Sequence, residues 1–462
     1  MLARVATLVL TAWAMGSAAS ALEFPLQLKT MTPKLAAQIP GVQGHYTMLQ
    51  VAKPQTVKNE PEAKSEFPLY GAFGEGPNPG VKVRVFRLDE SKGAGTGYDL
   101  LILDINANGD LSDDPVIEAQ TEISLPAGPS GFEQRLFKPI SIPLEKGKAS
   151  QSLTFSVQTY IHNRQQIGIS KGGEFLGQAN LAPACYLEAL VQLGAMSEKI
   201  GIVDANANAR FGDKAQCQEV ASGASKYRYF HSFDVVLRDR DGSGQFEKDL
   251  CDTESEAFSS VLYFAGNPYS VVLADDLSAI RLEPYSGPLG EITAENLDQV
   301  RVLTLGWQGE GGQWEVITPQ PQQGKIKAPA GSYALSQAVL MGKNSQGVIV
   351  MAKGYNRGNG QPIQVAAGQA VALRCGAPLE LRVKTDNQTG ASGSFLQALA
   401  NVFTAAPKAE SVTINVEVIG AGDEAYSIFA RGPNLTERLN APKFRVLGAD
   451  GKVVASGQLE YG

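Results

Sequence analysis

The stretch Ser411–Ile419, SVTINVEVI, indicates the class of fold more clearly than any other part of the chain. Its apolar residues occupy every second position and its polar residues lie between them, with Val412, Ile414, Val416 and Val418 against Thr413, Asn415 and Glu417. Successive side chains of a β-strand point to opposite faces, so this period of two predicts a strand with one buried face. We therefore expect Ser411–Ile419 to belong to an antiparallel sheet.

Paired apolar runs of the same kind recur along the chain, at Leu187–Leu193 with Lys199–Val203, Val261–Phe264 with Tyr269–Leu273, and Lys443–Leu447 with Lys452–Ser456. Gly266-Asn267-Pro268 and Asp450-Gly451 supply turn residues for the last two pairs. In the first run Leu190 falls on the opposite face, which leaves a short helix as the alternative. Ser394–Phe403 has the spacing of an amphipathic helix. The fold class predicted is all-β, with several domains built as antiparallel sandwiches.

Turn-rich stretches divide the chain into four predicted parts. Residues 1–21 form a signal peptide, and residues 22–283 form a β-rich region that carries three unusual loops. The turn-rich segment Pro284–Gly290 separates this region from a β-domain at residues 291–375. After Gly376-Ala377-Pro378, several short strands predict an immunoglobulin-like sandwich at residues 376–462.

The N-terminus has the features of an export signal. Arg4 precedes the apolar run Val5–Met15, and Ala19-Ser20-Ala21 provides a small-x-small cleavage site. The apolar run is shorter than the roughly 20 residues that span a bilayer, so we expect export to the periplasm or the medium and no membrane span. In an oxidising compartment Cys217 and Cys251 are the first candidates for a disulfide, and buried thiols are the alternative.

Composition excludes several classes of protein. With 43% hydrophobic residues among 462, the chain is too apolar to be disordered. The net charge is -7 and no dense run of Lys or Arg occurs, which argues against a nucleic-acid partner.

Three segments repeat one arrangement of oxygen-bearing residues directly after predicted strands, and we name them the first, second and third loops. The candidate metal ligands are Asp104, Asn106, Asn108, Asp110, Asp113 and Asp114 in the first loop, Asp204, Asn206, Asn208, Arg210 and Asp213 in the second, and Asp239, Asp241, Ser243, Gln245, Glu247 and Asp249 in the third. Arg210 and Gln245 are candidate ligands through their main-chain carbonyl oxygens and not through their side chains.

The spacing of these residues is typical of a Ca²⁺ loop. Calcium takes six to eight oxygen ligands, which alternate side chains at positions 1, 3 and 5 and the carbonyl of position 7 can supply. Glycine at position 6 permits the sharp turn, and Gly109 and Gly244 hold that position where the second loop has Ala209. Apolar residues at position 8, Leu111, Phe211 and Phe246, are expected to anchor each loop to a core. The competing interpretation is that such Asn-Gly and Asp-Gly clusters only make tight turns.

The loops depart from the helical EF-hand at position 12, where the bidentate glutamate is replaced by Pro115, Ala215 and Leu250. The closing carboxylate must therefore come earlier in each loop. Together with the signal peptide and the strand-rich C-terminal region, the DxNxNG and DxDxSG loops resemble uncharacterised exported proteins of planctomycete-like bacteria. That resemblance implies export and calcium.

No catalytic residue is predicted, since the sequence has no HExxH or P-loop signature. We therefore expect an exported protein with structural Ca²⁺ as its cofactor, which binds a cell-surface protein or a glycan without catalysis. The alternative hypothesis is a secreted hydrolase of polysaccharide or peptide with accessory calcium loops, which needs two carboxylates in one cleft. Trp307 and Trp314 flank a Gly-rich turn and form either a sugar-stacking platform or part of a core.

Overall fold

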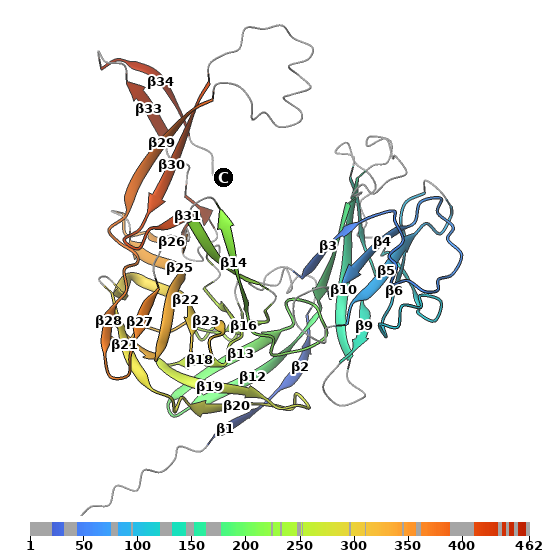
Figure 1. The fold of residues 1–462 in the computed structure, drawn as a ribbon, viewed down its shortest axis with the longest axis horizontal. Helices are drawn as coiled ribbons and strands as arrows, with labels where there is room; N and C mark the ends of the chain where they lie inside the picture. The colour runs from blue at the N-terminus through green and yellow to red at the C-terminus, as the bar shows by residue number, and fades with distance from the viewer. Residues whose placement is uncertain are drawn as a thin grey trace, which may run out of the picture.

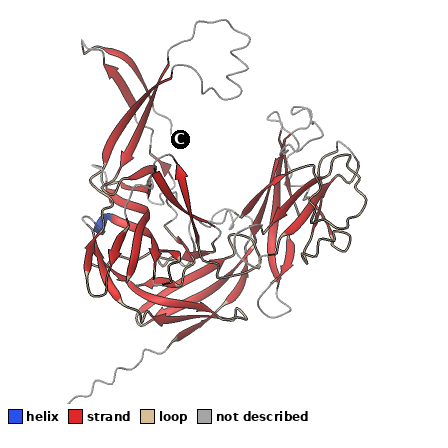
Figure 2. Cartoon of the chain, viewed as in Figure 1, coloured by secondary structure: helices blue, strands red, loops and turns tan. Residues whose placement is uncertain are grey.

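The computed structural model describes residues 21–31, 44–74, 82–93, 96–120, 132–144, 152–162, 177–222, 225–231, 233–246, 251, 253–294, 297–309, 311–343, 346–356, 362–388, 411–432, 437–439, 443–447 and 451–458. Among these residues nearly all regular structure is β, and the single helical element is the short 3₁₀ turn η1 (Leu297–Gln299) (Figure 2). The predicted all-β, multidomain fold is therefore confirmed.

The first body is a sandwich of two antiparallel sheets, on the right of Figure 1. One sheet has the order β3 (His45–Leu49), β11 (Gly177–Pro183), β10 (Ser152–His162), β8 (Phe132–Leu136), with β9 (Ile140–Pro143) beside β10. The other has the order β4 (Leu69–Phe73), β5 (Arg84–Asp89), β6 (Leu100–Leu103), β7 (Val116–Glu118). One apolar core, which includes Phe73, Phe86, Phe137 and Phe155, lies between them.

The second body is also a two-sheet sandwich, with one core shared by both sheets. One sheet has the order β17 (Ser255–Ala257), β16 (Val235–Arg238), β13 (Met196–Val203), β12 (Cys185–Leu193), β2 (Gln27–Thr30). The other has the order β1 (Leu22–Pro25), β20 (Ala279–Pro284), β19 (Asn267–Leu273), β18 (Val261–Phe264). Strands β12 and β13 form a hairpin from Leu187↔Ile202 to Leu193↔Met196, so Leu187–Leu193 is strand and not the alternative short helix.

The third body pairs a small sheet with a nine-stranded one around a common core. The small sheet has the order β24 (Lys325–Pro329), β21 (Leu289–Thr293), β28 (Ala370–Ala372). The large sheet has the order β23 (Trp314–Ile317), β22 (Val300–Gln308), β25 (Gly331–Lys343), β26 (Ile349–Asn356), β31 (Glu424–Arg431), β30 (Ser411–Ile419), β29 (Glu380–Gln388), with β27 (Ile363–Val365) beside β25 and β32 (Glu437–Arg438) beside β31.

Two hairpins complete the described structure, β14 (Gln216–Ser222) with β15 (Ser225–His231) and β33 (Lys443–Leu447) with β34 (Val453–Gln458). Ser411–Ile419 is a strand as its alternation predicts, and β30 pairs with β29 along all nine of its residues. Because β26 pairs with β31, the large sheet runs across the boundary predicted at residue 376. The immunoglobulin-like C-terminal topology stays a prediction.

Two sequence predictions lie outside the described residues, and one predicted disulfide is wrong. The helix predicted at Ser394–Phe403 and residues 1–20 of the signal peptide lie outside the described residues. The predicted Cys217–Cys251 disulfide is wrong, because none of the four cysteines, all of which are described, forms a disulfide. Cys217 pairs with Phe230 in the β14–β15 hairpin, whereas Cys251 is packed in an apolar cluster with Val302 and Val339, so the two belong to different environments.

Gly71 on β4 offers a test of how tightly the first core is packed. A Cβ at this position would lie 2.4 Å from Cζ of Phe86, whose fully buried ring stacks on Phe73 with centroids 4.7 Å apart. We expect Gly71→Ala to lower the free energy of unfolding by about 1–3 kcal/mol, because the ring has no room to move. Urea denaturation measures it, with Gly342→Ala, whose Cβ would meet no atom within 4 Å, as the control. Equal effects of the two substitutions would show that the Phe86 ring moves to make room for the new Cβ.

Candidate metal centre

Each of the three loops begins at the residue after a strand, as the sequence predicts. Asp104 follows β6, Asp204 follows β13 and Asp239 follows β16. All three of these aspartates are buried, with exposed fractions of 1%, 1% and 7%. Burial of a carboxylate is costly unless hydrogen bonds or a cation compensate it, so the first residue of each loop marks a polar centre.

The loops share one backbone conformation, which explains why short side chains can turn inward. Positions 4 and 6 have positive φ in all three, at Ala107 and Gly109, at Ala207 and Ala209, and at Gly242 and Gly244. The sequence predicts the positive φ at position 6, whereas it does not predict the positive φ at position 4. The second loop keeps this conformation with alanine at both positions, although a left-handed conformation costs a residue with a Cβ about 1–2 kcal/mol. Ala209 therefore does not prevent the loop from forming.

In the first loop the side chains at positions 1, 3 and 5 fold back on the loop's own backbone. Asp104 accepts hydrogen bonds from the N–H groups of Asn108 (3.0 Å) and Gly109 (2.8 Å). Asn106 Oδ1 accepts one from the N–H of Asn108 (3.0 Å), and Asn108 Oδ1 one from the N–H of Asp110 (2.6 Å). The Asp110 carboxylate faces outward to Ser112 and Asn59, so its side chain takes no part in the loop's interior.

The two acids that end the first loop have different positions. Asp113 Oδ2 accepts a hydrogen bond from Asn108 Nδ2 (2.9 Å), so this carboxylate lies at the opening of the loop. Asp114 Oδ1 accepts one from the N–H of Ile105 (3.0 Å), whereas its buried Oδ2 has no hydrogen-bond partner among the described residues. Burial raises the pKa of Asp114 to about 6, with a contribution from the charge of Asp104.

The second loop repeats this arrangement. Asp204 accepts hydrogen bonds from the N–H groups of Asn208 (3.0 Å) and Ala209 (2.7 Å). Asp213 Oδ2 accepts hydrogen bonds from the side-chain amides of Asn206 (3.1 Å) and Asn208 (2.5 Å), as Asp113 does in the first loop. The side chain of Arg210 takes no part in these hydrogen bonds, and its backbone N–H donates to Asn208 Oδ1 (3.0 Å).

A further carboxylate, Asp234, lies against the second loop, and no sequence motif includes it. Its side chain is fully buried, and its Oδ2 accepts hydrogen bonds from the N–H groups of Gly212 (2.7 Å) and Asp213 (3.0 Å). Its Oδ1 is buried and has no hydrogen-bond partner among the described residues. Burial, and then the charges of Asp204 and Asp213, raise the pKa of Asp234 well above its ordinary value. Burial likewise raises the pKa of Asp204, to about 7.

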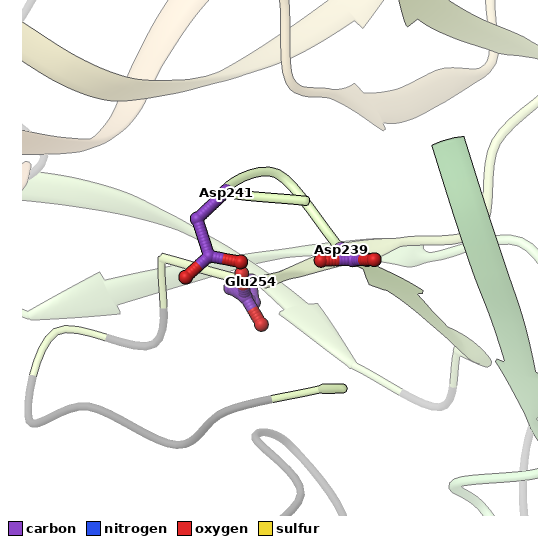
Figure 3. A group of neighbouring side chains, drawn as sticks. All are labelled: Asp239, Asp241 and Glu254. Atoms are coloured by element: carbon purple, nitrogen blue, oxygen red, sulfur yellow. The ribbon is translucent and has the colours of Figure 1, made fainter. Parts of the chain in front are cut away.

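The third loop brings its first two acids together with Glu254, which comes from the segment before β17. One carboxylate oxygen each of Asp239, Asp241 and Glu254 lies within 4.8 Å of the others (Figure 3). Asp239 and Glu254 are buried and Asp241 is exposed. Asp239 Oδ2 accepts a hydrogen bond from the N–H of Gly244 (2.9 Å), while its buried Oδ1 has no hydrogen-bond partner among the described residues.

Other predicted ligands of the third loop have mixed outcomes. Ser243 Oγ accepts a hydrogen bond from the N–H of Gln245 (3.2 Å), and both residues are exposed. Glu247 and Asp249, the predicted closing acids, lie outside the described residues. Glu254 was not predicted, and the only signal for it was an acidic residue directly before a strand that pairs with β16.

The carboxylate triad of the third loop has the donor set of a hard divalent cation. Oxygen ligands lie about 2.3–2.6 Å from calcium, so two of them on one ion are at most about 5 Å apart. The separations of at most 4.8 Å meet that limit. Beside the triad is a cavity of about 610 Å³, whose charged lining residues are Glu198, Asp239, Arg240, Asp241 and Arg301.

The two tryptophans do not form a shared platform. In the β22–β23 pair Trp307 lies opposite Glu315, and Trp314 lies opposite Gln308, so the two rings point to opposite faces of the sheet. Trp307 is buried in the third core and its Nε1 donates to the carbonyl of Ala330 (3.4 Å). Core packing is thus correct for Trp307, and the sugar-stacking platform is wrong.

Comparison with protein families, with curated proteins and with solved structures finds no match to this chain. Within the described parts of the chain, no helix has the length and apolarity needed to cross a bilayer.

Proposed function

We propose that the chain is an exported calcium-binding β-protein in which the third loop holds a structural Ca²⁺ ion. The observation that carries the proposal is the Asp239 carboxylate, which is 7% exposed, has one oxygen without a hydrogen-bond partner among the described residues, and converges with Asp241 and Glu254. A cation at this point supplies the compensation that a buried carboxylate needs.

Calcium suits this donor set better than magnesium. Three carboxylates, the hydroxyl of Ser243 and the carbonyl of Gln245 offer enough oxygens for the six to eight ligands of Ca²⁺. Mg²⁺ needs a smaller, nearly ideal octahedron and usually keeps several waters, so it is seldom bound by an all-protein cage.

The ion's role follows from the strands that its ligands join. Asp239 directly follows β16 and Glu254 directly precedes β17, and these strands pair from Leu237↔Ser255 to Val235↔Ala257. A shared ion would fasten the open end of this pair at the edge of its sheet. Export rests on the predicted signal peptide at residues 1–21.

A non-catalytic role, in binding a cell-surface protein or glycan, agrees best with the cavity beside the triad. Glu198, the remaining acid of that cavity, is held by two contacts to Arg238, at 2.6 and 2.8 Å. A glycosidase needs one carboxyl that can give up and take back a proton, and an ion-paired carboxylate is poorly suited to that. We therefore prefer binding to the hydrolase alternative.

Calcium binding by the third loop can be measured directly. We expect Asp239→Asn to bind one Ca²⁺ ion fewer per chain than the wild type in equilibrium dialysis, because the substitution removes a buried ligand charge. Asp276→Asn is the matched control, since Asp276 is no part of the third loop and caps an exposed turn by accepting from the N–H of Ser278 (3.1 Å). An unchanged number and affinity of bound ions in Asp239→Asn would refute the proposal.

A further inference from the structure

We infer that Asp234 completes a second, more deeply buried cation site with Asp204 and Asp213 of the second loop, and that this site takes Ca²⁺. The inference goes beyond the proposed function, which concerns the third loop, and either can fail alone. It concerns the loop in which Ala209 stands where the first and third loops have glycine at position 6.

Three carboxylates lie at the second loop, near enough for the charges of Asp204 and Asp213 to act on Asp234. Asp234 is fixed to the end of the second loop by accepting from the N–H groups of Gly212 and Asp213 and by donating its own N–H to the carbonyl of Asp213 (2.9 Å). The side-chain amide of Asn208 joins Asp213 to the loop, and the N–H of Asn208 donates to Asp204. Each of the three acids is therefore held by backbone or amide donors of the same loop. Among the described residues only the third-loop triad has its oxygens within 4.8 Å of one another, so an ion shared by Asp204, Asp213 and Asp234 would draw these side chains closer together.

The acids of this region are buried close to one another's charge. Asp234 and Asp204 are 0% and 1% exposed. The charge of Arg84, whose guanidinium donates to the carbonyl of Ile105 (3.3 Å), acts favourably on Asp204. The charges of Asp204 and Asp213 act unfavourably on Asp234, and like charges repel strongly in a medium of low dielectric constant.

The unpartnered oxygen is the independent observation that points to a ligand. Asp234 Oδ1 is buried in a fully buried residue and makes no hydrogen bond among the described residues. A buried, ionised oxygen without a hydrogen-bond partner destabilises the folded state. A cation beside it would bind this oxygen and relieve the repulsion from Asp204 and Asp213. A proton shared among the acids is the competing occupant, and the experiment below separates the two.

The position of the site gives the ion a structural consequence. Ala207 and Ala209 of the second loop belong to the core of the first sandwich, while Phe211 packs against the cores of both the first and the second sandwich. Asp234 directly precedes β16 of the second sandwich. A cation held by Asp204, Asp213 and Asp234 would therefore fix the junction between these two bodies.

The test counts bound ions in single and double variants. We expect Asp234→Asn, which keeps a side-chain acceptor for Gly212 and Asp213, to bind one Ca²⁺ fewer per chain than the wild type or to weaken one site at least about tenfold. Asp239→Asn should keep the Asp234-dependent ion, and the double variant should bind two fewer than the wild type. In EDTA, Asp234→Asn should unfold at no lower denaturant concentration than the wild type, because removing a charge relieves repulsion.

Each outcome decides between the two occupants. If Asp234→Asn binds as many ions as the wild type with the same affinity, a shared proton occupies the site and the inference is wrong. If Asp239→Asn alone abolishes all calcium binding, the inference fails while the proposed function stands. If Asp234→Asn does not fold, as judged by circular dichroism, Asp213→Asn is measured instead, since its more exposed side chain tolerates the change, and an unaltered ion count there overturns the inference.

Discussion

Replacing Arg238 by alanine is expected to lower the free energy of unfolding by about 3–5 kcal/mol, the cost of removing one partner from a buried ion pair. The Arg238 side chain is fully buried at the end of β16. Its guanidinium contacts Glu198 at 2.6 and 2.8 Å, pairs with Glu256, and donates to the carbonyl of Tyr263 (3.0 Å). Alanine would leave the Glu198 carboxylate in this interior without its cation, whereas Glu256 would keep Arg240 (2.8 Å).

The size of this effect separates a buried network from an ordinary surface pair. Arg281→Ala removes a contact to Glu23 of 3.2 Å in which both side chains are more than half exposed. Solvent screens that pair, so we expect a cost of about 0–1 kcal/mol. Urea denaturation of both variants gives the comparison. Similar midpoints for Arg238→Ala and Arg281→Ala would mean that water reaches the network and that its burial contributes little.

The strands could be predicted from sequence because their signals are local. In Ser411–Ile419 the alternation is complete within nine residues, and in Val261–Phe264 and its partner the turn lies between the two strands. The three loops were predictable for the same reason, since the residues at positions 1, 3 and 5 and the turn between them are contiguous. The sheet that spans residue 376 could not be predicted, because the pairing of β26 with β31 joins residues far apart in the chain.

The candidate site was only half predictable, because its remaining carboxylates come from pairings that are not local. Glu254 reaches the third loop because β17 pairs with β16, and Asp234 reaches the second loop because β16 pairs with β13. Neither acid falls in a motif. The positive φ at position 4 was also missed, because Ala107 and Ala207 carry no sequence signal for it. Side chains that close a loop from another strand require the sheet topology first.

Withdrawing calcium is expected to have an effect as large as the loss of Arg238. An ion that binds only the folded state stabilises it by about 2.7 kcal/mol when its free concentration is 100 times the dissociation constant. Two such sites, one in the third loop and one with Asp234 in the second, would together contribute about 5 kcal/mol. The measurement is urea denaturation in calcium and then in EDTA, at equal ionic strength so that general screening does not differ.

The dependence on calcium concentration distinguishes these sites from nonspecific screening without knowledge of either dissociation constant. Once both sites are occupied, each tenfold increase in free calcium should raise the free energy of unfolding by about 1.4 kcal/mol per site, hence about 2.7 kcal/mol for two. Asp239→Asn and Asp234→Asn should each halve this slope, and the double variant should have almost none. A slope near zero in the wild type would contradict both sites. A slope that neither substitution changes would place the bound ions elsewhere, with the first loop, where Asp113 and Asp114 lie beside Asp104, as the next location to test.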